Sequence, residues 1–224
     1  MSTRTRGIPP EELVELELDA VRLGGNLNRP SDAHGVVVFA HGSGSSRYSP
    51  RNRYVAEGLQ EAGLATLLFD LLTPDEELED SRTAELRFDI GLLAGRLVGA
   101  IDWLAQHPPT RSLRTGLFGA STGGGAALVA AAERPALVHA VVSRGGRPDL
   151  AGRALARVRA PTLLIVGGHD EPVIRLNQQA LAQLTSVKKL DIVPGATHLF
   201  EEPGTLGQVA RLAGEWFVKY LTPM

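Results

Sequence analysis

Cysteine is absent from the 224 residues of this sequence. Its absence excludes disulfide bonds, thiolate metal sites and a cysteine nucleophile, so any covalent catalysis has to use another side chain. A chain without cysteine also fits a reducing compartment, and we expect a cytoplasmic protein.

Strong charge and long apolar runs are lacking as well. The formal net charge is only −2, which produces no field that would attract nucleic acid or anionic lipid. The longest apolar run, residues 126–132, is far shorter than the roughly 20 residues that span a bilayer. Arginines near the N-terminus are followed by no apolar stretch, so they do not resemble a secretory signal. We therefore expect a small-molecule partner, with no nucleic acid and no membrane.

The composition is that of an ordinary globular protein. Hydrophobic residues make up 43% of the chain and charged residues 21%, which is enough apolar material to cover both faces of a sheet. A hydrophobic core need not divide below roughly 250 to 300 residues. We expect one domain over residues 1–224.

Apolar runs and amphipathic segments alternate along the chain. Runs rich in β-branched residues are expected to be buried strands at 36–40, 65–69, 115–118, 138–143, 162–166 and 189–193. Helical spacing occurs between them at 52–62, 84–106, 121–133, 174–185 and 206–221. This succession predicts a mostly parallel α/β sheet with helices on both faces. Ligands of such sheets bind beyond the carboxyl ends of the strands.

Two further segments differ from this pattern. Residues 13–23 alternate apolar and acidic side chains, so we expect edge strands within residues 1–30, ahead of the parallel part. Residues 71–82 are rich in aspartate and glutamate with little to bury. A solvated loop is the simpler interpretation of residues 71–85, and a mobile lid is the alternative.

A candidate nucleophile follows one of the predicted strands. Gly119-Ala120-Ser121-Thr122-Gly123 stands between a strand and a helix, the context that a nucleophile elbow requires. Small residues on either side of Ser121 leave room for the sharp turn that projects its Oγ above the sheet. The alternative is a glycine-rich helix start in which Ser121 is only a cap.

A candidate acid and a candidate base follow two later strands. Because a serine hydroxyl is nearly inert at neutral pH, it needs a base that a carboxylate holds in the right tautomer. Asp170 and His198 have the order after Ser121 that G-x-S-x-G hydrolases show. The alternatives are His169 beside the acid, and three carboxylates that could replace Asp170: Glu171, Glu201 and Asp149.

With this order of residues the chain resembles the α/β-hydrolase family, in particular its small dienelactone-hydrolase-like esterases, from about residue 36 to the C-terminus. The resemblance implies an α/β-hydrolase fold without a substantial cap domain. Dienelactone hydrolases proper use a cysteine nucleophile, whereas this chain offers Ser121, so the resemblance leaves the substrate open.

A second glycine-rich turn follows the first parallel strand as His41-Gly42-Ser43-Gly44. It occupies the position from which the family directs an N–H group toward the oxyanion, and the lipase-type HGGG run is absent. We predict that the backbone N–H groups of Ser43 and Thr122 form the oxyanion hole. The alternative is a turn without catalytic duty, and His41 is expected to pack or to orient the loop.

Arginines gather in the loops expected at the catalytic edge. Because guanidinium groups match carboxylates and phosphates, we hypothesise that Arg47, Arg51 or Arg144 binds an anionic part of the substrate. The alternative, which also covers Arg53 and Arg147, is that these side chains pair with nearby acids.

Together these residues predict a serine hydrolase that cleaves a carboxylic ester or lactone through an acyl-enzyme, with no metal and no organic cofactor. Fold and triad do not fix the acceptor, so an acyltransferase, an amidase and a carbon–carbon hydrolase stay open. A non-catalytic binding protein on the same fold is the alternative from a different class.

Overall fold

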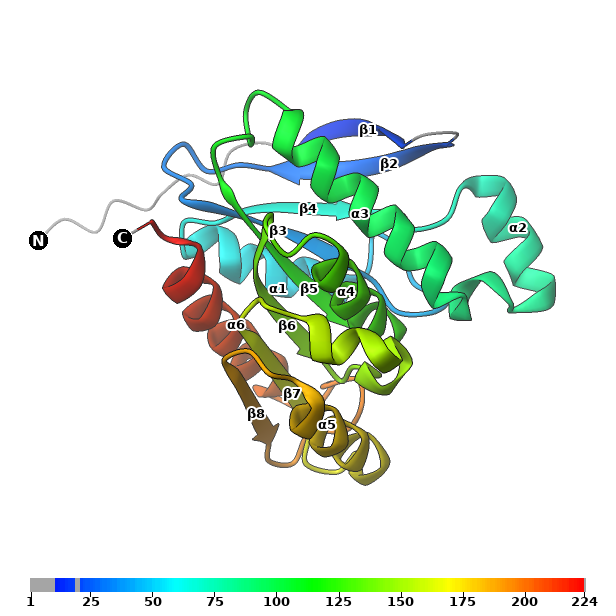
Figure 1. Cartoon of the computed structure of the whole chain (residues 1–224), viewed down its shortest axis with the longest axis vertical. Coiled ribbons are helices and arrows are strands. Elements are labelled where there is room, and N and C mark those ends of the chain that lie inside the picture. The colour runs from blue at the N-terminus through cyan, green and yellow to red at the C-terminus, as the bar shows by residue number, and fades with distance from the viewer. Residues whose placement is uncertain (1–10, 19–20, 224) are drawn as a thin grey trace, which may run out of the picture.

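A computed structural model describes residues 11–18 and 21–223 of the chain (Figure 1). The strands of this part join one eight-stranded sheet in the order β1-β2-β4-β3-β5-β6-β7-β8. β1 pairs antiparallel with β2 and β2 antiparallel with β4, and every later pairing is parallel. The strands are β1 (Glu12–Leu18), β2 (Val21–Asn28), β3 (Gly35–Ala40), β4 (Ala65–Phe69), β5 (Arg114–Ala120), β6 (Val138–Arg144), β7 (Thr162–Gly167) and β8 (Lys188–Val193).

Helices cover both faces of the sheet, which confirms the predicted fold class (Figure 1). α1 (Pro50–Glu61) and α6 (Thr205–Leu221) pack on one face, while α3 (Ile90–Gln106), α4 (Thr122–Glu133) and α5 (Glu171–Gln183) pack on the other. The remaining helical segments are α2 (Pro74–Thr83) and two 3₁₀ helices, η1 (Leu86–Phe88) and η2 (Pro148–Arg157). No helix among the described residues has both the length and the apolarity needed to cross a membrane.

The central strands are buried along their whole length because both faces of the sheet are covered. All six residues of β3 are buried, and they alternate between the two cores. Val37 and Phe39 face α1 and α6, whereas Val36 and Val38 face the other helices. Such strands appear in the sequence as continuous apolar runs, which is why the predicted strand positions agree with β3 to β7. The predicted position of β8 agrees as well, although most of this edge strand is exposed.

The outer hairpin has a different pattern. On β1 the side chains of Leu16 and Leu18 are buried, while Glu15 and Glu17, which alternate with them, are exposed. In the described residues β1 lies at the edge of the sheet and β2 joins it to β4, and edge strands over residues 1–30 stay a prediction. Residues 1–10 of the predicted edge region lie outside the described residues.

The acid-rich segment predicted as a loop is the helix α2, so that prediction is wrong. Its N-terminus is a capping box: Glu76 N–H donates to Thr73 Oγ1, and Thr73 N–H donates to Glu76 Oε2. The positive end of the helix dipole stabilises the acidic residues of this first turn. Near the other end the Asp80 side chain, 2% exposed, forms an ion pair with Arg87. A lid motion of this segment stays a prediction.

Two other helical segments differ from what the sequence predicts. The helix predicted from residue 84 begins at Ile90, because the Asp89 side chain accepts the N–H of Leu92 and caps α3 there. The 3₁₀ segment η2 was not predicted, and it contains a kink at Gly152, whose φ is 49°. The other predicted helices agree with the structure to within three residues at each end.

Candidate active site

Ser121 occupies a strained turn between β5 and α4. Its φ is 52° and its ψ is −121°, a left-handed conformation that costs a residue with a Cβ roughly 1–2 kcal/mol. Hydrogen bonds hold the turn on both sides: Ser121 N–H donates to the Arg144 carbonyl at 3.3 Å, and the Ser121 carbonyl accepts the N–H of Gly124 and that of Arg147, each at 3.0 Å. The structure thus places Ser121 at the carboxyl end of β5 in the predicted elbow.

Glycine is required beside this turn because the backbones approach each other closely. A Cβ added at Gly123 would lie 2.3 Å from the carbonyl oxygen of Ala40, and one at Gly119 would lie 2.5 Å from that of Gly123. Both distances are far below van der Waals contact, so α4 can start directly against the end of β3 only with glycine there.

His198 and Asp170 lie together although two separate loops carry them: Asp170 is in the β7–α5 loop and His198 in the β8–α6 loop. His198 Nδ1 is 2.6 Å from Asp170 Oδ2. Since a carboxylate only accepts, Nδ1 carries the proton and Nε2 is left as the acceptor. The side chain of Asp170 is 13% exposed and that of His198 is 39% exposed, so the acid is sheltered and the base is accessible.

The base also lies beside the strand end that holds Ser121. A Cβ built on Gly145 would lie 3.6 Å from the Cε1 and Nδ1 atoms of the His198 ring. Gly145 follows Arg144, whose carbonyl accepts the Ser121 N–H. Ser121, Asp170 and His198 therefore gather at the carboxyl edge of the sheet, and their catalytic roles stay predictions.

The alternative acids have other partners. Glu171 lies 3.6 Å from Arg175, Glu201 3.2 Å from Arg51, and Asp149 2.7 Å from Arg147. Among these carboxylates the one hydrogen-bonded to His198 in the described part of the chain is Asp170. The geometry favours Asp170 over the three alternatives.

The predicted oxyanion groups flank Ser121. A Cβ on Gly42 would lie 3.2 Å from the Cβ of Ser121, so the turn that carries Ser43 runs directly past the serine. Thr122 is the first residue of α4, where the helix dipole favours negative charge. Ser43 and Thr122 line the same small cavity. Within the described ranges neither backbone N–H donates a hydrogen bond to the protein, so their role as oxyanion donors stays a prediction.

His41 joins this turn to the segment that follows β4. Its Nδ1 is 3.0 Å from the Gly42 carbonyl, and Leu71 N–H donates to its Nε2 at 3.2 Å. Burial lowers the pKa of His41 below the usual histidine value, although the Gly42 carbonyl and Asp70 act in the opposite direction. A neutral imidazole with its proton on Nδ1 satisfies both bonds, which fits the orienting role predicted for His41.

Most of the predicted arginines pair with acids. Arg47 forms an ion pair with Asp70, Arg51 with Glu201 at 3.2 Å, Arg53 with Glu11 at 3.6 Å, and Arg147 with Asp149 at 2.7 Å. This is the alternative that the sequence left open. A contact of Arg47 or Arg51 with substrate stays a prediction.

Arg144 is different because it is buried without an acid. It is 5% exposed, and its guanidinium donates to Asn52 Oδ1 at 3.3 Å and lies 5.8 Å from the ring centre of Phe200. Burial, followed by repulsion from Arg51, lowers the pKa of Arg144 to about 10. No carboxylate in the described part of the chain forms an ion pair with it. Arg144 thus has spare capacity for an anion, and its predicted substrate contact stays a prediction.

Sequence reasoning missed several residues around the site because their roles depend on distant neighbours. The Ser143 hydroxyl is buried without a partner and lies beneath the elbow, where Cβ atoms on Gly124 or Gly146 would collide with it. Glu77 lines the small cavity at Ser43. Partial burial raises the pKa of Glu77, and the negative charge of Asp80 adds to this effect. No three histidine, aspartate or glutamate side chains among the described residues gather into a metal-binding group.

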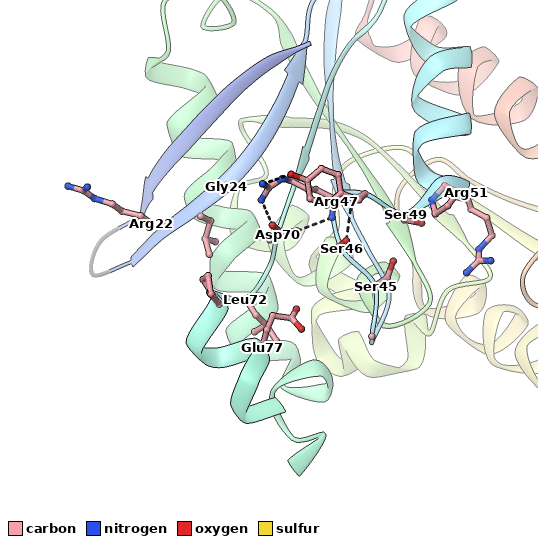
Figure 2. A pocket seen from close by; sticks show the side chains of 15 residues that line it. Arg22, Gly24, Ser45, Ser46, Arg47, Ser49, Arg51, Asp70, Leu72 and Glu77 are labelled. Atoms are coloured by element: carbon pink, nitrogen blue, oxygen red, sulfur yellow. Dashed lines mark hydrogen bonds and ion pairs between the residues drawn. The ribbon is translucent and has the colours of Figure 1, made fainter. Parts of the chain in front are cut away.

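A larger cavity of about 650 Å³ adjoins the turn that carries Ser43 (Figure 2). Its walls come from residues 44–51, from the start of β2 and from the start of α2. Arg47 bridges these elements, because its backbone N–H donates to Asp70 Oδ1 at 2.9 Å and its guanidinium pairs with Oδ2. Gly24 of β2 permits this bridge, since a Cβ there would lie 2.3 Å from the guanidinium.

Comparison with known proteins places this chain in a family. The model of the dienelactone hydrolase family matches residues 23–217. A crystal structure of a dienelactone hydrolase from Anabaena variabilis superposes with a TM-score of 0.94 at 68% identity, covering 95% of this chain and 99% of that one.

Two curated relatives have different names. A Mycobacterium tuberculosis protein named as a putative phosphoribosyl transferase is 60% identical over 215 residues, which are 95% of this chain and 48% of that protein. The chain thus spans about half the length of this relative. A Bradyrhizobium protein named as a probable 2-oxo-3-(5-oxofuran-2-ylidene)propanoate lactonase is 30% identical over 169 residues, 66% of each chain.

Proposed function

The chain belongs to the dienelactone hydrolase family of ester-cleaving hydrolases, and on that premise we propose that it cleaves a carboxylic ester or lactone through an acyl-enzyme on Ser121. The observation that carries the proposal is the 2.6 Å contact between His198 Nδ1 and Asp170 Oδ2, beside a serine in a left-handed elbow. In this scheme His198 is the general base and Asp170 orients it.

The first half of the reaction forms the acyl-enzyme. Ser121 Oγ attacks the carbonyl carbon of the substrate while His198 Nε2 takes the hydroxyl proton. Asp170 stabilises the imidazolium that forms. The carbonyl electrons move onto the oxygen, where the N–H groups of Ser43 and Thr122 and the N-terminus of α4 oppose the negative charge.

The second half releases the acid. As the tetrahedral intermediate collapses, the carbon–oxygen ester bond breaks and the imidazolium returns its proton to the departing alkoxide. Water then attacks the acyl-enzyme with His198 again accepting a proton, and Ser121 Oγ is regenerated. For a lactone, the alcohol and the acid leave as parts of one molecule.

Hydrolysis is favoured over phosphoribosyl transfer as the activity of this chain. The match to the dienelactone hydrolase family covers residues 23–217, so the half of the M. tuberculosis relative that resembles this chain is the hydrolase-like half. The name of the Bradyrhizobium relative supports a lactone or ester as substrate. Transfer to an alcohol, amide cleavage and carbon–carbon bond hydrolysis remain alternatives on the same residues.

Labelling with a fluorophosphonate probe tests the proposal directly. We expect the wild-type protein to be labelled and to hydrolyse short p-nitrophenyl esters, and Ser121→Ala to lose both properties. His198→Ala and Asp170→Asn should label far more slowly. Absence of labelling and turnover in folded wild-type protein would favour a non-catalytic binding protein on this fold.

Matched controls separate the proposed acid and base from their neighbours. His169→Ala and Glu171→Gln alter residues adjacent to Asp170 in the chain, and both should keep near wild-type labelling. A loss in Glu171→Gln with Asp170→Asn unaffected would move the acid to Glu171.

A further inference from the structure

The 650 Å³ cavity beside the oxyanion turn adjoins the reacting centre. Gly44, Ser45, Leu72 and Glu77 line both this cavity and the small one that contains Ser43 and Thr122. A substrate whose carbonyl oxygen points to these two N–H groups therefore has one end directed toward the larger cavity. The chemistry of its walls restricts what that end can be.

The walls of the cavity carry few exposed apolar side chains. Leu23 and Leu72 line it, but they are 1% and 4% exposed and belong to the hydrophobic core. The accessible polar side chains include Ser45 on the turn and Glu77 on α2 (Figure 2). The exposed apolar groups are Pro50, Pro74 and the ring of Tyr48, and a long alkyl group would have only these to cover.

The charges favour hydroxyl groups over an anion. The three arginines of the cavity are already paired, Arg22 with Glu15 and Glu17, Arg47 with Asp70, and Arg51 with Glu201. The Glu77 carboxylate forms no hydrogen bond or ion pair within the described residues, so the unpaired charge in the cavity is negative. A phosphate or carboxylate would face this carboxylate, whereas a hydroxyl would donate to it.

Hydrogen-bonding groups that suit a polyol line the cavity together with Glu77. The Ser45 hydroxyl has no partner within the described residues. Tyr48 presents an exposed ring, and its hydroxyl accepts from Arg47 at 2.7 Å, which leaves its own proton free to donate. A carboxylate, hydroxyls and an exposed aromatic face together match the alternating polar edges and apolar faces of a sugar ring.

From this arrangement we infer that the cavity is the subsite for a neutral polyhydroxylated group, a sugar or glycerol moiety, on the alcohol side of the ester. The inference rests on the proposed ester hydrolysis, because the cavity adjoins the turn that is predicted to bind the oxyanion. Glu77 and Ser45 are its specificity-determining residues. The Glu77 carboxylate accepts one hydrogen bond from the polyol, and the Ser45 hydroxyl forms another with it.

Substrates that share an acetyl group test this subsite. We expect wild type to have a kcat/KM for 6-O-acetylglucose and glycerol monoacetate at least tenfold above that for n-hexyl acetate. Glu77→Gln and Ser45→Ala should reduce this ratio by about tenfold, which corresponds to one lost hydrogen bond to a charged or polar group. Preference for n-hexyl acetate, or for the acetyl ester of glycerol 3-phosphate over glycerol monoacetate, would overturn the inference.

Glu79→Gln is the matched control, because it removes the same charge from an exposed position of the same helix. It should change the ratio by less than twofold. An equal loss in Glu79→Gln and Glu77→Gln would show a general effect of helix charge and would contradict the subsite.

A binding experiment separates this inference from the proposed function. Saturation-transfer NMR of methyl glucoside with the Ser121→Ala protein should show transfer to the sugar, and the double variant with Glu77→Gln should show much less. Transfer without any esterase activity in wild type would retain the subsite and refute the ester hydrolysis. Absence of transfer would refute the subsite whatever the activity.

Discussion

The Nδ1 atom of His198 lies 2.6 Å from Oδ2 of Asp170, and 28 residues of sequence separate the two side chains. Asp170→Asn replaces the acceptor by an amide that can donate, so it no longer selects the tautomer with the proton on Nδ1. We expect kcat for p-nitrophenyl acetate to fall by roughly 10³- to 10⁴-fold with little change in KM. A fall of less than about tenfold would contradict the assignment of the acid.

Two glycines in helices should respond to alanine in opposite ways. Gly123→Ala brings a Cβ to 2.3 Å from the Ala40 carbonyl, and we expect it to lower the free energy of unfolding by more than about 2 kcal/mol. Gly95 has no atom within 4 Å of an added Cβ, so Gly95→Ala should raise that free energy by about 0.5–1 kcal/mol. Urea denaturation measures both, and equal effects would refute the close approach at Gly123.

Acid should destabilise the protein in part through His41. Because burial lowers the pKa of His41 in the folded state, the unfolded chain binds a proton there first as the pH falls. The free energy of unfolding should therefore decrease below about pH 6.5, the ordinary histidine pKa, until the lowered folded-state pKa is reached. Urea titrations from pH 8 to pH 5 should show a smaller decrease for His41→Gln, which cannot be protonated. Identical pH profiles for the two proteins would argue against the buried neutral imidazole.

Replacing Arg144 tests whether this buried arginine contributes to stability or to substrate binding. Arg144 is 5% exposed and forms no ion pair with an acid of the described residues, and replacing a buried charge by an apolar side chain of similar length often raises stability by about 1 kcal/mol or more. We expect Arg144→Met to be at least as stable as wild type in urea. If Arg144 binds an anionic part of the substrate, the same variant should lose about tenfold in kcat/KM for mono-p-nitrophenyl succinate relative to p-nitrophenyl acetate.

The control for this prediction is Arg53→Met, which alters an arginine whose side chain is 42% exposed and paired with Glu11. It should change neither stability nor the succinate-to-acetate ratio appreciably. A marked loss of stability in Arg144→Met alone would mean that the guanidinium is mainly a structural group bonded to Asn52.

The sheet could be predicted from the sequence because its inner strands are buried on both faces. Residues 163–166 are apolar without interruption, and they form the middle of β7. The helix α2 was harder to predict because its interior has no apolar stripe, and its evidence is confined to the cap. Thr73 and Glu76 form the capping box, and Pro74 stands at the start of the helix, so these signals are present in the sequence. The acidic composition of the segment nevertheless suggested a loop.

The residues of the candidate site could be predicted where the order of residues along the chain identifies them. They could not be predicted where their role depends on contacts between distant residues. Ser121, Asp170 and His198 could be named because each follows a predicted strand. That Arg47 pairs with Asp70, while Arg144 has no acidic partner in the described part of the chain, cannot be seen in a sequence, because such contacts join loops that follow different strands. Glu77 lay within the segment interpreted as a loop, and its place beside the oxyanion turn follows only once α2 is known.

The strand β8 ends the sheet and pairs with β7 alone, and most of its side chains are at least partly exposed. The loop that carries His198 leaves this strand, while Ser121 leaves the fully covered β5. Local opening at a sheet margin needs less energy than melting of the centre. Warming should therefore separate the base from the serine before the molecule as a whole unfolds, so that thermal inactivation precedes the loss of helical circular dichroism and reverses on cooling.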